Sequence, residues 1–350
     1  MSFTVLTLLS LIGLIFGIYY FINMRPGSKS SLRESYSEGL DLLVSGQRKE
    51  AYQHFKSIVQ HDSNNIKAYI KLGQVLRESG NPSQALKIHK NLKIRSKITT
   101  FEKIELHKNL SLNFIALNKV DEAIDEVKKI LSINPSNEWA LTNLINCYKK
   151  KEDWERASNY LIQYHKISQT QDSHLVGLYK IQEGRIALKN KNFEKARECF
   201  HQSLEIFPDL SSAYLFLGNT YAEESEVSYK KAMELDDKEF QTPNEKEDYS
   251  DSVDKAKKQL AQAIPMWTKF TEKNSDQSWL VLPKIKDALF ALNRFNEIEE
   301  VLKEILSKNP DNVNVLSSLA DFYNQKGAHE DAIAIIESAI EKEPNSLIAN

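Results

Sequence analysis

Small apolar residues recur along most of the chain at a fixed spacing. Gly39 and Gly73 stand 34 residues apart, as do Gly184 and Gly218, and an alanine follows twelve residues after three of these glycines. A small residue lets two helices approach closely, so this period predicts a stack of helical hairpins with a glycine in the first helix and an alanine in the second. The fold class that we predict is all-α, with the hairpins forming an α-solenoid.

Other residues around these positions are typical of tetratricopeptide repeats. A tyrosine and a leucine precede both Gly73 and Gly218, and Pro135, Pro208 and Pro310 stand where second helices would end. We expect about eight repeats, which start near residues 32, 66, 104, 138, 177, 211, 251 and 279.

One stretch interrupts the array. Residues 236–254 are acidic and poor in apolar residues, and they include a proline. We expect a polar loop or linker here, between about six hairpins over residues 32–235 and a second set over residues 255–350. A helical hairpin with a long connection is equally compatible with the same residues.

The first 24 residues have a different character, because none of them is charged. The 21 mainly apolar positions from residue 3 to residue 23 would span about 30 Å as a helix, the thickness of a bilayer's hydrocarbon core. We therefore expect residues 1–24 to form a transmembrane anchor and residues 25–31 a juxtamembrane linker. A cleaved signal peptide is the competing interpretation, which the missing basic n-region and the length of the apolar run disfavour.

The same segment predicts an orientation and a contact. Arg25, Lys29 and Arg33 follow the span and no Lys or Arg precedes it, so we expect the N-terminus outside and the repeats in the cytoplasm. Gly13 and Gly17 form a G-x-x-x-G pair, which would let a partner helix approach within the membrane. A chance pairing of two glycines is the alternative.

Composition and motifs add little specific chemistry. The net charge is -2, so we expect no nucleic-acid partner. The sequence contains no phosphate-binding loop, H-E-x-x-H, G-x-S-x-G or C-x-x-C, and its 8 histidines show no metal-ligand spacing. We therefore expect no enzyme activity, cofactor or metal in this chain. Cys147 and Cys199 should be buried structural thiols.

The remaining candidate function is the binding of proteins in a groove. In arrays of this kind the first helices line the concave face. Amide and basic side chains over apolar patches would suit an extended peptide or a partner helix with acidic groups. Ordinary solvated side chains are the alternative interpretation. The candidate groove residues are Lys67, Gln74, Arg77, Lys108, Trp139, Asn146, Lys149, Arg185 and Asn219.

The first half of the chain combines the N-terminal span and the basic stretch after it with three distinctive segments. These are 39–43 (GLDLL), 72–80 (LGQVLRESG) and 85–92 (ALKIHKNL). The arginine of the second segment and the Ile-His of the third are not general tetratricopeptide features. In this combination, over roughly residues 1–165, the chain resembles the lipopolysaccharide assembly protein B family.

The resemblance implies an inner-membrane protein whose cytoplasmic repeats regulate lipopolysaccharide synthesis. It implies an adaptor that brings a lipid A deacetylase to a membrane-bound AAA protease, partly through the transmembrane helix and its glycines. The family ends in a rubredoxin-like zinc module with two C-x-x-C pairs, which this sequence does not contain. Either the chain is a fragment that continues past residue 350, or it is a divergent relative.

Three classes of function remain open. The first, which we take as the main hypothesis, is the membrane-anchored adaptor that controls lipopolysaccharide synthesis. The second is a tetratricopeptide scaffold for another membrane assembly, such as a secretion, motility or respiratory complex. The third is an enzyme whose catalytic domain lies beyond residue 350.

Overall fold

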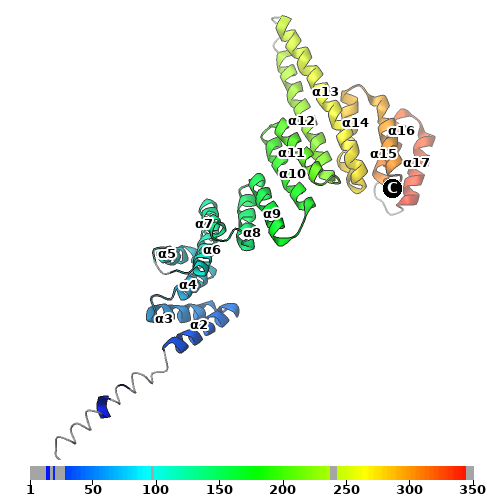
Figure 1. Ribbon diagram of the computed structural model, residues 1–350. Coiled ribbons are helices and arrows are strands. Elements are labelled where there is room, and N and C mark those ends of the chain that lie inside the picture. Colours follow the sequence, from blue (N-terminus) through cyan, green and yellow to red (C-terminus); the bar gives the residue numbers. More distant parts are fainter. Residues whose placement is uncertain (1–12, 16–18, 20–27, 96–97, 237–242, 344–350) are drawn as a thin grey trace, which may run out of the picture. The chain divides into compact units, whose positions relative to one another are not determined.

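Every regular element that the structure describes is a helix (Figure 1). The computed structural model describes residues 13–15, 19, 28–95, 98–236 and 243–343. The prediction of an all-α chain is therefore confirmed for these residues. Most of the expected anchor, including Gly17, lies outside them. Among the described residues, no helix has both the length and the apolar character that a membrane crossing requires.

The chain forms two compact units, residues 1–147 (unit 1) and residues 148–350 (unit 2). In unit 1, three consecutive helix pairs precede α8, which runs on into unit 2. Local signals set the helix ends: Asn65 caps α4 by accepting from the Ala68 amide, and Thr99 and Glu102 form a capping box at α6. The helices are α2 (Ser28–Val44), α3 (Arg48–His61), α4 (Ile66–Glu78), α5 (Pro82–Leu92), α6 (Thr100–Ala116), α7 (Val120–Ile133) and α8 (Glu138–Lys150).

In unit 2, α10 pairs with α11, α12 with α13, and α16 with α17. A core of buried residues from α13, α14, α15 and α16 joins the last elements. The elements are α9 (Trp154–Ser168), α10 (Ser173–Lys189), α11 (Phe193–Ile206), α12 (Ser211–Asp236), α13 (Pro243–Lys273), η1 (Ser275–Leu280), α14 (Leu282–Ala291), η2 (Phe295–Glu297), α15 (Ile298–Lys308), α16 (Val313–Lys326) and α17 (His329–Lys342).

The periodic glycines mark where each first helix meets a ring of its second helix. A Cβ added at Gly39 would lie 3.0 Å from Cζ of the Phe55 ring. The approach is closer in three other pairs. The distances are 2.3 Å at Gly73 to His89 Nε2, 2.5 Å at Gly184 to Phe200 Cε1 and 2.4 Å at Gly218 to Trp267 Nε1.

These four rings are also related in sequence. Each ring stands four residues after a fully buried alanine of the second helix. An alanine and an aromatic residue at this spacing lie on the same helix face, so both point at the first helix. The four combinations are Ala51 with Phe55, Ala85 with His89, Ala196 with Phe200 and Ala263 with Trp267.

The loop that we expected over residues 236–254 is wrong for residues 243–254, which are helical, as the alternative of a helical hairpin allowed. The sixth pair has no early turn: α12 continues to Asp236 and α13 begins at Pro243. Nearer the base of the pair, part of the packing between α12 and α13 is polar. Ser225 Oγ donates to the Ala256 carbonyl at 2.7 Å, and Ser228 Oγ donates to Gln259 Oε1 at 2.9 Å. These hydroxyls satisfy buried polar groups, so two polar helices can pack closely.

The lengthened pair also explains why the repeat start expected near residue 251 was misplaced, whereas the one near residue 279 lies close to the start of α14. The ring that packs on Gly218 is Trp267, 49 residues later, whereas Phe200 follows Gly184 by 16 residues. The expected start near residue 251 therefore lies inside α13. The following first helices begin at Leu282 in α14 and at Val313 in α16.

We expect Gly184→Ala to destabilise the fold more than Gly177→Ala. Both glycines lie in α10, so the gain in helix propensity of about 1 kcal/mol is shared. The new methyl at residue 184 would overlap the fully buried Phe200 ring, whereas at residue 177 its nearest neighbour is the end of Leu210 at 3.3 Å. Overpacking of this kind costs about 1–3 kcal/mol. Urea unfolding followed by circular dichroism measures the difference, and equal midpoints for the two variants would contradict the ring contact.

Candidate functional site

The predicted groove residues all lie on first helices, but they differ in their surroundings. In unit 1, Lys67 and Asn146 are exposed. Gln74 is engaged within its own helix, since it accepts from Lys71 at 2.9 Å and donates to Glu78 at 2.9 Å. These side chains are the ordinary solvated positions that formed the alternative interpretation.

Arg77 belongs instead to a polar network between α4, α5 and α6. Its Nη1 donates to Asn109 Oδ1 at 3.0 Å and to Asn113 Oδ1 at 3.2 Å. Asn113 Nδ2 then lies 2.7 Å from His89 Nδ1, and His89 Nε2 lies 3.0 Å from the Ile70 carbonyl. The arginine of the α4 segment and the histidine of the α5 segment therefore belong to one network.

The partners of His89 fix its protonation. The Ile70 carbonyl can only accept, so Nε2 carries the proton and Nδ1 accepts from the Asn113 amide. Burial lowers the pKa of His89 to about 4, with the Arg77 charge acting in the same direction against the Ile70 hydrogen bond. The ring is therefore neutral at pH 7, and it positions Arg77 through Asn113.

A cation of one first helix lies over an aromatic ring of the next first helix in three places. The two residues are separated by 30 or 31 positions each time. Contacts of this kind contribute about 0.5–1 kcal/mol at exposed sites. The cations lie 5.2, 5.6 and 5.3 Å from the ring centres in the pairs Lys108 over Trp139 in unit 1, and Lys149 over Tyr179 and Arg185 over Phe216 in unit 2.

The three cations differ in their charge partners. Lys108 pairs with Glu105 of its own helix at 3.7 Å. Arg185 donates to the neutral Gln182 amide at 2.9 Å, and neither it nor Lys149 has a carboxylate partner within the described part of the chain. In unit 2 the first-helix side therefore presents two positive charges that no side chain there neutralises.

Asn219 lies where α12, α13 and α14 meet. Its Oδ1 accepts from Trp267 Nε1 at 3.2 Å and from Lys284 Nζ at 2.8 Å. Lys284 also lies over the Trp267 ring, 5.8 Å from its centre. Asn219 therefore fixes the position of a ring and a cation from two later helices.

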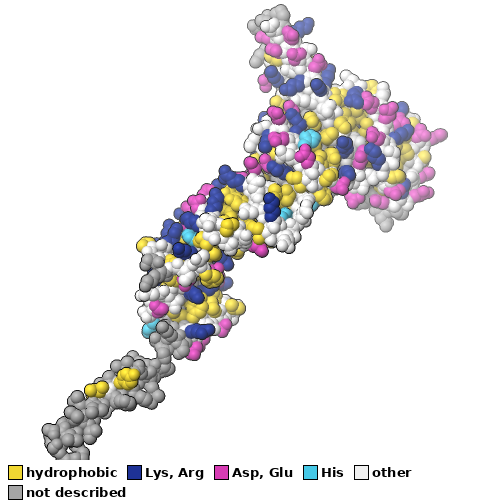
Figure 2. Space-filling view, in the orientation of Figure 1, with side chains coloured by type: hydrophobic (Ala, Val, Ile, Leu, Met, Phe, Trp, Pro, Cys, Tyr) yellow, Lys and Arg dark blue, Asp and Glu magenta, His cyan; other side chains and the backbone are white. Residues whose placement is uncertain are grey.

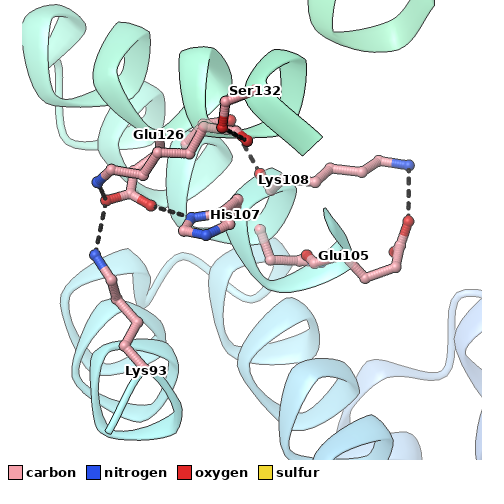
Figure 3. Close-up of polar contacts among 9 residues, drawn as sticks. Lys93, Glu105, His107, Lys108, Glu126 and Ser132 are labelled. Carbon is pink, nitrogen blue, oxygen red and sulfur yellow. Dashed lines mark hydrogen bonds and ion pairs between the residues drawn. The ribbon is translucent and has the colours of Figure 1, made fainter. Parts of the chain in front are cut away.

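A titratable cluster with three donors surrounds Glu126 of α7 (Figure 3). Its carboxylate accepts from Lys93 at 3.0 Å, from Lys129 at 2.8 Å and from His107 Nδ1 at 2.6 Å. Burial alone would raise the pKa of Glu126, but the hydrogen bonds from His107, Lys129 and Lys93 hold it at about 2. Glu126 is only 5% exposed, so this cluster joins α5, α6 and α7 rather than facing a ligand.

Neither cysteine is placed as a nucleophile. Both cysteines are buried and neither is in a disulfide, as the sequence predicted. Burial, with the Glu183 charge, raises the pKa of Cys199 to about 12, so this thiol is not ionised at pH 7. Within the described ranges, no three His, Cys, Asp or Glu side chains are grouped as ligands of a metal would be.

The sequence reasoning found the cations of the first helices, as well as Trp139 and Asn219, but missed the other rings and amides that contact them. The signal is a second spacing: an aromatic residue stands 30 or 31 positions after Lys108, Lys149 and Arg185, close to one repeat length. The missed residues are Asn109, Asn113, Tyr179, Phe216, Trp267 and Lys284.

Family models match three segments of the chain. Two tetratricopeptide-repeat models match residues 178–210 and 289–350. A third, described as a domain of unknown function (DUF7017), matches residues 34–172. The chain therefore carries tetratricopeptide repeats, a fold that in general serves as a non-catalytic scaffold.

Among curated relatives, lipopolysaccharide assembly protein B of Escherichia coli (strain K12) is 24% identical over 126 residues, 36% of this chain and 32% of that protein. The alignment thus spans about a third of the length of that relative. The protein of the same name from Haemophilus influenzae is 22% identical over 331 residues, 91% of this chain and 74% of that protein. DnaJ homolog subfamily C member 3 of Gallus gallus is 24% identical over 342 residues, 89% of this chain and 66% of that protein.

We expect Glu126→Gln to destabilise the protein by about 3 kcal/mol at pH 7, since a shift from 4.5 to about 2 corresponds to that free energy. The folded-state pKa is lowered, so the stabilisation is complete above pH 4.5 and is lost as the pH falls toward 2. The gap between wild type and variant should therefore narrow below pH 4.5. Unfolding in urea between pH 3 and pH 7 measures it. The exposed Glu122→Gln, also in α7, is the control, and a gap that does not depend on pH would contradict this account.

Proposed function

We propose that this chain is a membrane-anchored scaffold that binds protein partners through its first helices and serves lipopolysaccharide assembly. One observation carries the binding part: Lys149 and Arg185 lie over aromatic rings in unit 2 without a carboxylate partner among the described residues. A ring below each cation limits its side-chain freedom, so a partner carboxylate meets a positioned charge. This chemistry suits an acidic protein segment.

The lipopolysaccharide part rests on the relatives. Two of them carry that role in their names, at 22–24% identity. As an adaptor, the chain would link a lipid A biosynthetic enzyme such as the deacetylase to a membrane AAA protease. Residues 1–24 would anchor it in the inner membrane with the repeats in the cytoplasm, and Gly13 and Gly17 would contact a partner helix there.

A scaffold for another membrane assembly is the second candidate. The DnaJ homolog is as similar as the Escherichia coli relative and aligns with 89% of this chain. Sequence identity of this size therefore reflects shared repeats rather than a shared role. The identity of the partners distinguishes the lipopolysaccharide adaptor from a scaffold for another membrane assembly.

The partner test compares two charge reversals in the full-length chain, purified from its native cells in detergent. Lys149→Glu with Arg185→Glu should reduce co-purification of a lipid A enzyme and a membrane protease at least tenfold, because two positioned cations become anions. Lys166→Glu with Lys189→Glu makes the same change in charge at exposed positions and should leave co-purification unchanged. Quantitative mass spectrometry measures the recovered partners.

Two results would contradict parts of this proposal. Equal recovery from both double variants would exclude the first-helix cations of unit 2 as the binding surface. Enrichment of a different membrane machine, with no enzyme of lipid A synthesis, would overturn the lipopolysaccharide assignment and favour the second candidate.

The anchor has its own test. Removal of residues 1–24 should shift the protein from the membrane fraction to the soluble fraction after cell lysis. Gly13→Leu with Gly17→Leu should leave it in the membrane but reduce recovery of membrane partners, since bulky side chains prevent close helix approach. Immunoblotting of the fractions reports the first effect, and an unchanged distribution after the deletion would exclude an anchoring role.

A further inference from the structure

The long pair α12–α13 leaves a groove beside α14. The far ends of α12 and α13 extend beyond their neighbours, whereas α14 has only 10 residues and ends at Ala291 (Figure 1). Two adjoining cavities of about 400 and 480 Å³ lie between the long pair and the short α14. Both are lined by Ala222, Leu260 and Ala291, so they form one groove, which we call the α12–α14 groove.

The shape of the α12–α14 groove suits a helix. It runs along α12 from Asn219 to Tyr229, which is about 15 Å or three helical turns. Its floor consists largely of alanines together with Leu260, so the backbone of another helix can approach closely. Tyr229 at one end is 53% exposed, and hydrophobic side chains gather on unit 2 beside the base of the long pair (Figure 2).

The walls of this groove carry two carboxylates without partners. Glu223 of α12 and Asp287 of α14 both line it, and neither has a hydrogen bond or ion pair within the residues that the structure describes. Two lysines also line the groove: Lys284 donates to Asn219, and Lys257 lies at the Tyr229 end. Burial, with the charge of Glu226, raises the pKa of Glu223 although the charge of Lys284 acts in the opposite direction, so a further cation beside Glu223 would relieve an unfavourable environment.

Two neighbouring carboxylates of α12, by contrast, do have ion-pair partners. Glu224 of α12 pairs with Arg197, and Glu226 pairs with Lys230 at 2.6 Å. The acidic residues one and three positions after Glu223 are thus paired, whereas Glu223 and Asp287 form no ion pair among the described residues.

We propose that the α12–α14 groove binds an amphipathic helix of a partner protein, about three turns long, whose apolar face covers Ala222, Leu260 and Ala291 and whose Lys or Arg side chains pair with Glu223 and Asp287. Apolar anchors and flanking charge pairs are the usual contacts of a helix in a groove. The inference rests on the proposed scaffold function, but its charge is opposite to that of the Lys149 and Arg185 surface. The chain would therefore hold a basic partner and an acidic partner at different places.

In-cell photo-crosslinking tests the occupant. Tyr229 is replaced by benzoylphenylalanine in the full-length chain, a similar ring at an exposed end of the groove. Irradiation should yield a crosslink to one partner, and mass spectrometry should place it in a helical segment with Lys or Arg flanking an apolar face. Glu223→Lys with Asp287→Lys should reduce this product at least tenfold. Glu205→Lys with Glu341→Lys, at exposed positions elsewhere, is the matched control.

Three results would overturn the inference: no crosslink, a crosslink to a second copy of this chain or to an acidic segment, or a product that survives the charge reversal in the groove. Melting curves of both double variants show that the fold is kept. If the chain without charge reversals gives no crosslink at Tyr229 while Lys149→Glu with Arg185→Glu still reduces partner recovery, only the groove inference is overturned. If Lys149→Glu with Arg185→Glu leaves partner recovery unchanged while the groove crosslink forms as expected, only the proposed acidic-partner surface is overturned.

Discussion

The contact between a glycine of one helix and a buried ring of the next sets the spacing of this array. At Gly73, Gly184 and Gly218 the ring lies where a Cβ would have to be, so the two helices are closer there than any other residue would allow. This distance also fixes which residues of a first helix face outward and how many residues separate equivalent outward-facing positions of successive first helices. The 30- and 31-residue spacing of the cation and ring pairs follows from it, because neighbouring first helices keep nearly constant register.

In the polar network at Arg77, the ring that packs on a glycine also forms hydrogen bonds. His89 packs on Gly73 as Phe200 packs on Gly184, yet its two nitrogens also join the Ile70 carbonyl to Asn113. A phenylalanine would fill the same space but leave the Asn113 amide and the Ile70 carbonyl without this partner. The histidine therefore adds a directional link between α5 and α6 to a purely steric contact.

Much of this fold was predictable from residues that repeat, and the errors arose where the repeat is interrupted. Gly39, Gly73 and Gly184 with their alanines predicted the first helix pairs, because close packing allows few residues there. The segment before Asp254 was misread because it is acidic and has no apolar period, although residues 243–254 belong to α13. The first-helix cations were found from the period as well. Three of their rings return at nearly the same period, but Glu223 and Asp287 come together only because of which helices become neighbours, and the period does not specify this.

The long pair α12–α13 carries a consequence for how such arrays change over evolutionary time. Its ring contact at Gly218 lies near the base, whereas residues added toward the far ends meet only each other. Seven residues inserted in each helix add about two turns and return the side chains to the same faces. The length of α12 and α13 can therefore vary by whole turns while the neighbouring hairpins keep their contacts. The sixth pair is thus a position where the array can gain new surface without changing the surfaces of the other hairpins.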